Sequence, residues 1–232
     1  MSDADARADD ETTIAGWYGK LPSLGDFAAR RLPDAFVAPW DAWLAERVVE
    51  TRQALGEDWL SLYLTCPVWR FFAMPGAIAP ALDACWTGVV MASVDRVGRH
   101  FPLTIAASLA DAPSTGEDVA ALWRWLSTIE DVALAALDFD HSIERLDAQL
   151  AALPAPTLTP MPTVPEQPWR VESEAALPDA FARMCGALWR NEAAGMSVWT
   201  SAQAPSRPFT LWPARGLPDT ALFITLLRDR EP

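Results

Sequence analysis

Six prolines crowd into residues 153–168, and this stretch constrains the fold of the chain more than any other feature. Proline fixes φ and lacks a backbone N–H, so neither a helix interior nor a central strand tolerates such a density. We therefore predict an extended linker or a surface loop here. The remaining regions divide into an acidic, disordered tail at 1–12, an α+β core at 13–152 that ends in two helices, and a helix and strand portion at 169–232 packed on the core.

Hydrophobic runs with β-branched and aromatic residues predict strands at Ile14–Lys20, Val68–Met74, Thr87–Val94 and Phe101–Leu109. The last two are joined by a short polar connection that contains Gly98, which is typical of a hairpin. The sequence therefore predicts a central, mainly antiparallel sheet with helices on its flanks, an α+β fold.

Helical spacing of apolar residues predicts a helix with Pro39 in its first turn and Gly56 at its C-cap. Two later helices are expected to begin at a capping box of Ser114 and Glu117 and at a cap on Asp140. Trp125 lies off the apolar stripe of its helix, which makes it a candidate for an exposed aromatic. Further helices are predicted at Ala176–Trp189 and Pro218–Arg228, and short strands at Ser197–Thr200 and Phe209–Trp212.

Composition excludes several classes of function. The net charge of −13 opposes nucleic-acid binding, and the N-terminus is acidic, unlike a secretory signal. Two histidines and three irregularly spaced cysteines do not match the spacing of a metal site, and the cysteines are expected to be free thiols of a reducing compartment. No nucleotide-binding or nucleophile motif is present in the sequence. We expect a cytoplasmic protein that is not inserted in a membrane, is not an enzyme and carries no cofactor or metal.

Two segments combine glycine, proline and arginine in a pattern that core packing does not require. The candidate site residues in them are Lys20, Pro22, Ser23, Gly25, Asp26, Phe27, Arg30, Arg31, Asp95, Arg96, Gly98 and Arg99. In one interpretation the two segments bind each other, with Asp26 pairing with Arg96 or Arg99 and Asp95 with Arg30 or Arg31. In the other, their arginines contact a partner, since guanidinium suits carboxylates and phosphates.

Four sequence motifs resemble those of the TagF (ImpM) family of type VI secretion proteins and occur in the same order. They lie at Gly19–Phe27, Pro39–Leu44, Pro67–Phe71 and Ser93–Leu103. The resemblance implies an α+β fold with a longin- or profilin-like sheet. It also implies a cytoplasmic accessory protein that represses secretion post-translationally and whose partner is a forkhead-associated scaffold protein. It supplies no catalytic residues.

Two alternatives remain open from the sequence. The first is a phosphate- or nucleotide-binding protein, or an enzyme, that uses the Lys20 segment with Arg96 and Arg99 as an anion site. The second is a structural accessory subunit of the secretion apparatus. The sequence leaves the oligomeric state undetermined.

Overall fold

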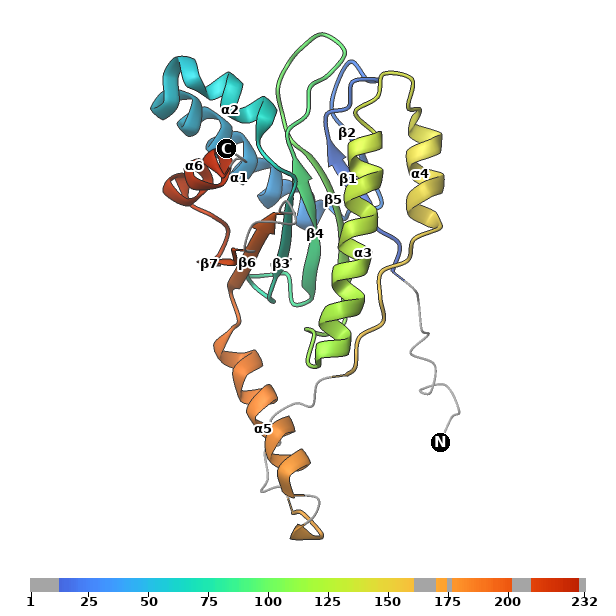
Figure 1. The fold of residues 1–232 in the computed structure, drawn as a ribbon, viewed down its shortest axis with the longest axis vertical. Helices are drawn as coiled ribbons and strands as arrows, with labels where there is room; N and C mark the ends of the chain where they lie inside the picture. The colour runs from blue at the N-terminus through green and yellow to red at the C-terminus, as the bar shows by residue number, and fades with distance from the viewer. Residues whose placement is uncertain (1–12, 161–169, 175–176, 202–209, 230–232) are drawn as a thin grey trace.

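The computed structural model describes residues 13–160, 170–174, 177–201 and 210–229. The predicted acidic tail and the second half of the proline-rich stretch lie outside these residues. Within them the chain forms one seven-stranded antiparallel sheet with helices on both faces, so the predicted α+β class is confirmed (Figure 1). The likeness of the sheet to longin or profilin stays a prediction.

The sheet has the strand order β2-β1-β5-β4-β3-β6-β7, and each neighbouring pair is antiparallel. The strands are β1 (Gly16–Gly19), β2 (Ala28–Arg30), β3 (Trp69–Ala73), β4 (Cys85–Met91), β5 (Leu103–Leu109), β6 (Met196–Ser201) and β7 (Trp212–Arg215). The predicted hairpin is β4 and β5, which pair along their whole length. The sequence analysis missed β2, which has three residues and no apolar alternation.

The helices lie in two layers (Figure 1). They are α1 (Asp34–Leu55), α2 (Trp59–Thr65), α3 (Gly116–Ala135), α4 (Ile143–Ala151), α5 (Leu177–Glu192) and α6 (Thr220–Arg228), with a 3-10 turn, Gly56–Asp58, between α1 and α2. Helices α3 and α4 cover one face of the sheet, and α1, α2 and α6 cover the other. Every residue of β4 is buried, as expected for a central strand covered on both sides.

The two faces of the sheet have different cores. Against α3 and α4 the core is mainly aliphatic, with Val89, Ile105 and Ile129 among its members. Against α1, α2 and α6 it is aromatic, and Trp40 and Trp199 are fully buried there. The abundance of tryptophan in the sequence therefore serves mainly the second face, where large rings fill the core with few residues.

The C-terminal portion completes the same sheet. Strand β6 pairs with β3, and β7 pairs with β6 at the edge. The predicted strand at Phe209–Trp212 is displaced toward the C-terminus, since β7 begins at Trp212, and residue 209 lies outside the described residues. Helix α5 extends away from the sheet at the lower end of Figure 1, and its Arg190 bonds to Asp111 at 2.7 Å.

Three predicted helix starts were wrong in position. Helix α1 begins at Asp34 after Pro33, so Pro39 lies inside the helix and removes one helical hydrogen bond. The capping box of α3 consists of Thr115 and Asp118. Helix α4 is capped by Ser142, whose hydroxyl accepts from the Arg145 amide. In the last two cases a second residue with capping ability stood one or two positions further along the sequence.

The first half of the proline-rich stretch follows the surface of α3. Thr159 donates from its amide and its hydroxyl to Asp118, at 3.0 Å each. Trp125 is buried and donates its indole N–H to the Leu153 carbonyl at 3.0 Å, so the expectation of an exposed aromatic was wrong. Residues 153–159 therefore cover the side of α3 that lies outside its apolar stripe.

Candidate functional site

Two loops lie side by side at one end of the sheet. The N-terminal loop, residues 20–27, follows β1, and the hairpin loop, residues 92–102, joins β4 to β5. They are neighbours because β1 pairs with β5, and both project at the top of Figure 1. Gly19 allows this close approach, because its φ is +134° and an added Cβ would lie 2.1 Å from the Pro102 carbonyl oxygen.

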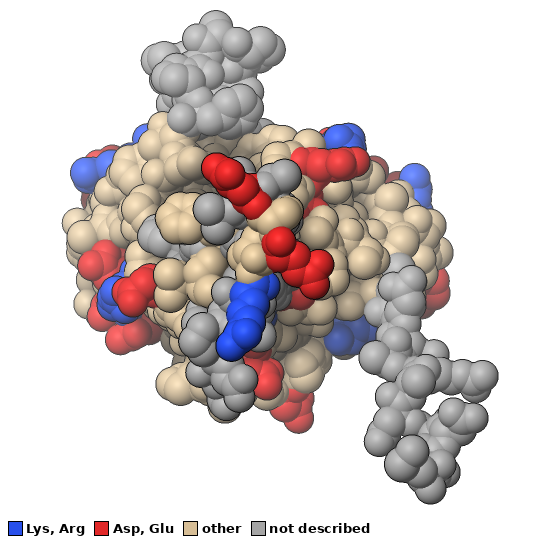
Figure 2. All heavy atoms as spheres, turned by 90° about the horizontal axis from the view of Figure 1, so that it is seen from below, with Lys and Arg blue, Asp and Glu red and all other residues tan. Residues whose placement is uncertain are grey.

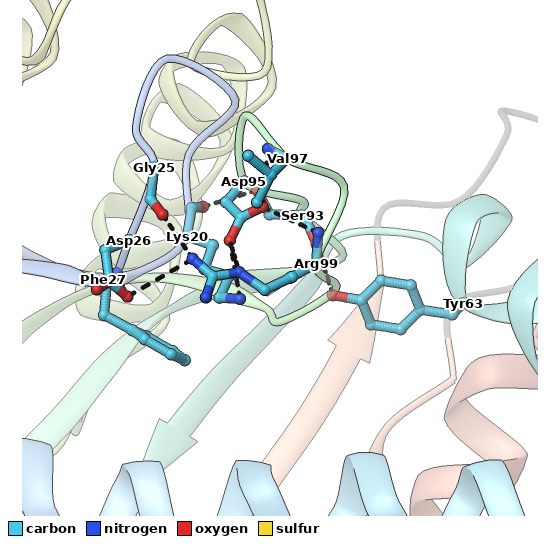
Figure 3. Close-up of polar contacts among 9 residues, drawn as sticks. All are labelled: Lys20, Gly25, Asp26, Phe27, Tyr63, Ser93, Asp95, Val97 and Arg99. Carbon is cyan, nitrogen blue, oxygen red and sulfur yellow. Dashed lines mark hydrogen bonds and ion pairs between the residues drawn. The ribbon is translucent and has the colours of Figure 1, made fainter.

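Asp95 is the centre of the contacts between the two loops (Figure 3). One carboxylate oxygen accepts the backbone N–H groups of Val97 at 3.0 Å and Arg99 at 2.9 Å. The other accepts the Arg99 Nε–H at 2.6 Å and contacts the Lys20 ammonium at 3.0 Å. A single buried carboxylate therefore fixes the hairpin loop internally and joins it to the N-terminal loop.

The charges at this centre compensate one another. Burial favours the neutral acid, but the hydrogen bonds from Arg99, Lys20 and Val97 outweigh it and hold the pKa of Asp95 well below its usual range. The only lysine of the chain, Lys20, is 4% exposed and has its ammonium against this carboxylate. A buried ammonium requires such a partner, since desolvation alone is costly.

Further hydrogen bonds join the backbones of the two loops. Ser93 donates its hydroxyl to the Lys20 carbonyl at 2.7 Å, and Arg99 donates to the Gly25 carbonyl at 2.5 Å. The Arg96 amide donates to the Leu24 carbonyl at 2.8 Å. The bonds of the Ser93 hydroxyl and the Arg96 amide involve no charged group, so they fix the relative position of the loops independently of the ion pairs.

Helix α2 supports the base of the hairpin loop through Tyr63. The Tyr63 hydroxyl donates to the Ser93 carbonyl at 2.9 Å and accepts from the Ser93 amide at 3.1 Å (Figure 3). His100 packs edge-on against the rings of Tyr63 and Trp59. Burial, with the nearby cations Arg52 and Lys20, lowers the pKa of His100, which favours the neutral ring.

Phe27 connects the N-terminal loop to the end of the hairpin loop and to β1. Its ring meets Phe101 edge-to-face with centroids 4.8 Å apart and stacks on Tyr18 at 6.0 Å. The Lys20 ammonium lies 4.8 Å from the centroid of the same ring. The ring is nevertheless 44% exposed, so part of it faces solvent beside the loops.

Of the predicted pairs, Asp26 lies 3.9 Å from Arg99, an exposed and long contact. The predicted pairing of Asp95 with Arg30 or Arg31 was wrong. Arg31 and Arg30 contact Asp147 of α4, at 3.1 and 3.7 Å, on the other side of β2. Asp147 also accepts the indole N–H of Trp17 at 2.9 Å, so it joins α4 to the edge of the sheet.

The remaining candidate residues have supporting positions. Pro22 is buried, and Ser23 and Gly25 are half-buried in the N-terminal loop. Gly98 has a φ of +83°, which a side chain would strain, and closes the turn by donating to the Asp95 carbonyl at 2.9 Å. Sequence reasoning missed Tyr63 and Asp147, because each acts through a partner more than 25 positions away in the sequence.

Two of the cations in the loops contact a carboxylate of the same site. Lys20 and Arg99 both use their charge on Asp95, so they do not form an open anion site. Among the described residues there is no group of three or more side chains able to hold a metal ion. Cys66 donates its thiol to the Tyr63 carbonyl at 3.2 Å, and burial raises the pKa of the Cys85 thiol to about 11; the Cys185 side chain lies outside the described residues.

Comparison with known proteins identifies the family. The family model described as TagF N-terminal domain, type VI secretion system-associated, matches residues 16–153. The chain belongs to the TagF family. The match contains both loops together with Tyr63, Asp118 and Asp147, so every residue of the site lies within the TagF N-terminal domain.

A solved structure resembles the whole TagF-family chain. The crystal structure of PA0076 from Pseudomonas aeruginosa PAO1 is 37% identical in sequence and superposes with a TM-score of 0.73. The alignment covers 92% of this chain and 93% of that one, so the likeness extends past the TagF N-terminal domain to the C-terminal portion. A search of curated proteins gave no match. In the described part of the chain no helix is long and apolar enough to cross a bilayer.

Proposed function

We propose that this TagF-family chain is a cytoplasmic, post-translational repressor of type VI secretion that acts by binding a forkhead-associated scaffold protein. Membership of a type VI secretion-associated family places it in that system. The finer role is our inference, and the geometry of the two loops is the observation that carries it. A surface made rigid by internal contacts suits recognition of another protein, because little conformational freedom is lost on binding.

The contacts of the charged residues favour binding over catalysis. The most buried charges, Lys20 and Asp95, contact each other at 3.0 Å and are occupied by structural bonds. Catalytic groups need an accessible atom and a pKa matched to proton transfer, whereas the pKa of Asp95 is far from neutrality. The loops therefore act in this proposal by shape and surface charge, and the chain is a binding protein without enzymatic activity.

Two measurements test the proposal. Purified chain and purified scaffold should associate at micromolar concentration or tighter, measured by calorimetry, and deleting the gene should raise secretion in cells that carry the intact scaffold. Absence of association together with unchanged secretion would reject the repressor role. Stoichiometric copurification with the membrane complex in place of the scaffold would favour a structural subunit of the apparatus.

A further inference from the structure

The two arginines of the hairpin loop have different surroundings. Arg99 bonds to Asp95 and to the Gly25 carbonyl, so it is part of the joint between the loops. The Arg96 backbone is fixed by its bond to Leu24, yet its guanidinium has no hydrogen bond or ion pair within the described residues. It passes over Gly25, where an added Cβ would lie 3.5 Å from Arg96 Nη2. Arg96 therefore presents a cation that the fold does not use.

The next residue, Val97, is 69% exposed, the highest value among the large hydrophobic side chains that the structure describes. Its backbone is held, because its N–H donates to Asp95 and the following Gly98 N–H closes the turn. Next to Gly98 an added Cβ would meet nothing within 4 Å, so the loop is open to an approaching surface. Because the backbone of this loop is already fixed, a partner that covered the Val97 side chain would bury apolar surface at little cost in conformational freedom.

The unpaired positive charge of Arg96 contrasts with the net negative charge of the chain. The chain carries −13 overall, and acidic side chains gather at the centre of the end opposite the loops (Figure 2). Among the described residues Arg96 is therefore a cation without a counter-charge, on a chain whose net charge is strongly negative. The complement of Arg96 and Val97 is an apolar depression bordered by carboxylates, because such a surface attracts Arg96 while the remaining acidic surface of the chain repels incorrect approaches.

We infer that Arg96, Val97 and Gly98, here named the hairpin tip, dock into an acidic-rimmed apolar depression on the scaffold protein. The inference rests on the proposed function and adds the contacting residues and the chemistry of the partner surface. The residues at Lys20, Asp95 and Arg99 position the tip and do not themselves contact the partner in this proposal. Arginine anchors next to apolar contacts commonly dominate the affinity of such interfaces.

The first test measures the affinity of full-length variants for purified scaffold. Arg96→Glu and Val97→Asp should each weaken binding at least about tenfold without changing Tm, since neither side chain supports the fold. Matched controls are Arg124→Glu and Val119→Asp on α3, where Val119 is 48% exposed. Helix α3 begins after the far end of β5, away from the hairpin loop, so these controls should stay within about twofold of the parent. Equal affinity of all four variants would refute the hairpin tip.

A second experiment separates failure of the tip from failure of the scaffold as partner. A photocrosslinking amino acid is placed at position 97, or at 119 as control, in cells that secrete. A scaffold adduct at 97 alone supports both proposals. An adduct at 97 with another identified secretion component, lost in Arg96→Glu, keeps the hairpin tip and rejects the scaffold. No adduct at 97, or equal adducts at both positions, overturns the hairpin tip.

Discussion

Asp95 and Asp118 are both buried carboxylates that accept several hydrogen bonds, but their donors differ. Asp95 contacts two cations, Lys20 and Arg99, as well as two amides. Within the described residues Asp118 accepts from neutral donors, namely the amides of Ser114, Thr115 and Thr159 and the hydroxyls of Ser114 and Thr159, at 3.0 to 3.2 Å. The first joins two loops by charge, and the second holds the proline-rich stretch to α3 by directional bonds alone.

The difference matters when the carboxylate is lost. Without Asp95, the positive charge of Lys20 stays buried near no carboxylate that compensates it. Without Asp118, only neutral groups lose a hydrogen-bond acceptor. A charged joint is therefore more sensitive to substitution than a neutral one with as many hydrogen bonds. The predictions below test that contrast, beginning with the condition that affects both sites.

Acid should have the largest effect, because it neutralises both carboxylates. For Asp118, burial raises the pKa, but hydrogen bonds from Thr159, Ser114 and Thr115 hold it well below its usual range, as also happens at Asp95. A carboxylate with a lowered folded-state pKa stabilises the protein above its unfolded value of about 3.9, and this stability disappears as pH falls toward the folded value. Urea titrations should show stability decreasing from about pH 4 downward. A free energy of unfolding that does not change below about pH 4 would contradict the lowered pKa values of Asp95 and Asp118.

Asp95→Asn is expected to be the most destabilising single substitution, with Tm lower by roughly 10 °C, because Lys20 loses its counter-charge inside the protein. Calorimetry measures it. Asp26→Asn, in the exposed part of the N-terminal loop, serves as control and should leave Tm unchanged. The double variant with Lys20→Met should recover part of the loss; a double variant no more stable than Asp95→Asn would show that the charge on Lys20 is not the cause.

Asp118→Asn should cost less, about 1–3 kcal/mol, since its amide nitrogen would face N–H and O–H donors but no charge is left buried. The free energy of unfolding from urea titration measures it. Residues 153–160 should also become sensitive to proteolysis, because their anchor at Thr159 is weakened. Glu117→Gln, exposed in the same helical turn, is the control. A loss as large as that of Asp95→Asn would remove the contrast between the two sites.

Tyr63→Phe should have the smallest effect, about 1 kcal/mol, because it removes two hydrogen bonds to Ser93 and keeps the ring packing. Hydrogen exchange should show faster exchange of the Ser93 amide and no change near Thr159. Equal loosening at both places would mean that the two carboxylate sites are coupled.

The sequence predicted the architecture well where patterns are local. The β4–β5 hairpin and the Gly56 cap of α1 follow from alternation and turn chemistry over a few residues. Of the pairings proposed within the two loops, the structure contains the one between Asp26 and Arg99, and the function of the loops remains a proposal. In the hairpin and the cap the deciding forces act between residues near in sequence.

The errors arose where a partner lies far away in sequence. Trp125 was expected to be exposed, because the stripe of α3 does not reveal that the proline-rich stretch covers that side. The pairing of Asp95 with Arg30 or Arg31 failed because β2 turns those arginines toward Asp147. The sequence did not identify the partner of Lys20, which is the carboxylate of Asp95 in the neighbouring loop. A sequence shows which residues carry opposite charges, but the topology of the fold decides which acid pairs with a given lysine or arginine.

The two outer strands restrict how this chain can assemble with others. Among the described residues the sheet ends at one side with β2, which spans three residues, and at the other with β7, which contains Pro213 and so lacks one N–H group. Such borders offer few backbone groups to an incoming strand. Growth of the sheet by recruiting a segment from another polypeptide is therefore disfavoured, and we expect a protein partner to contact side chains on loops and helices instead.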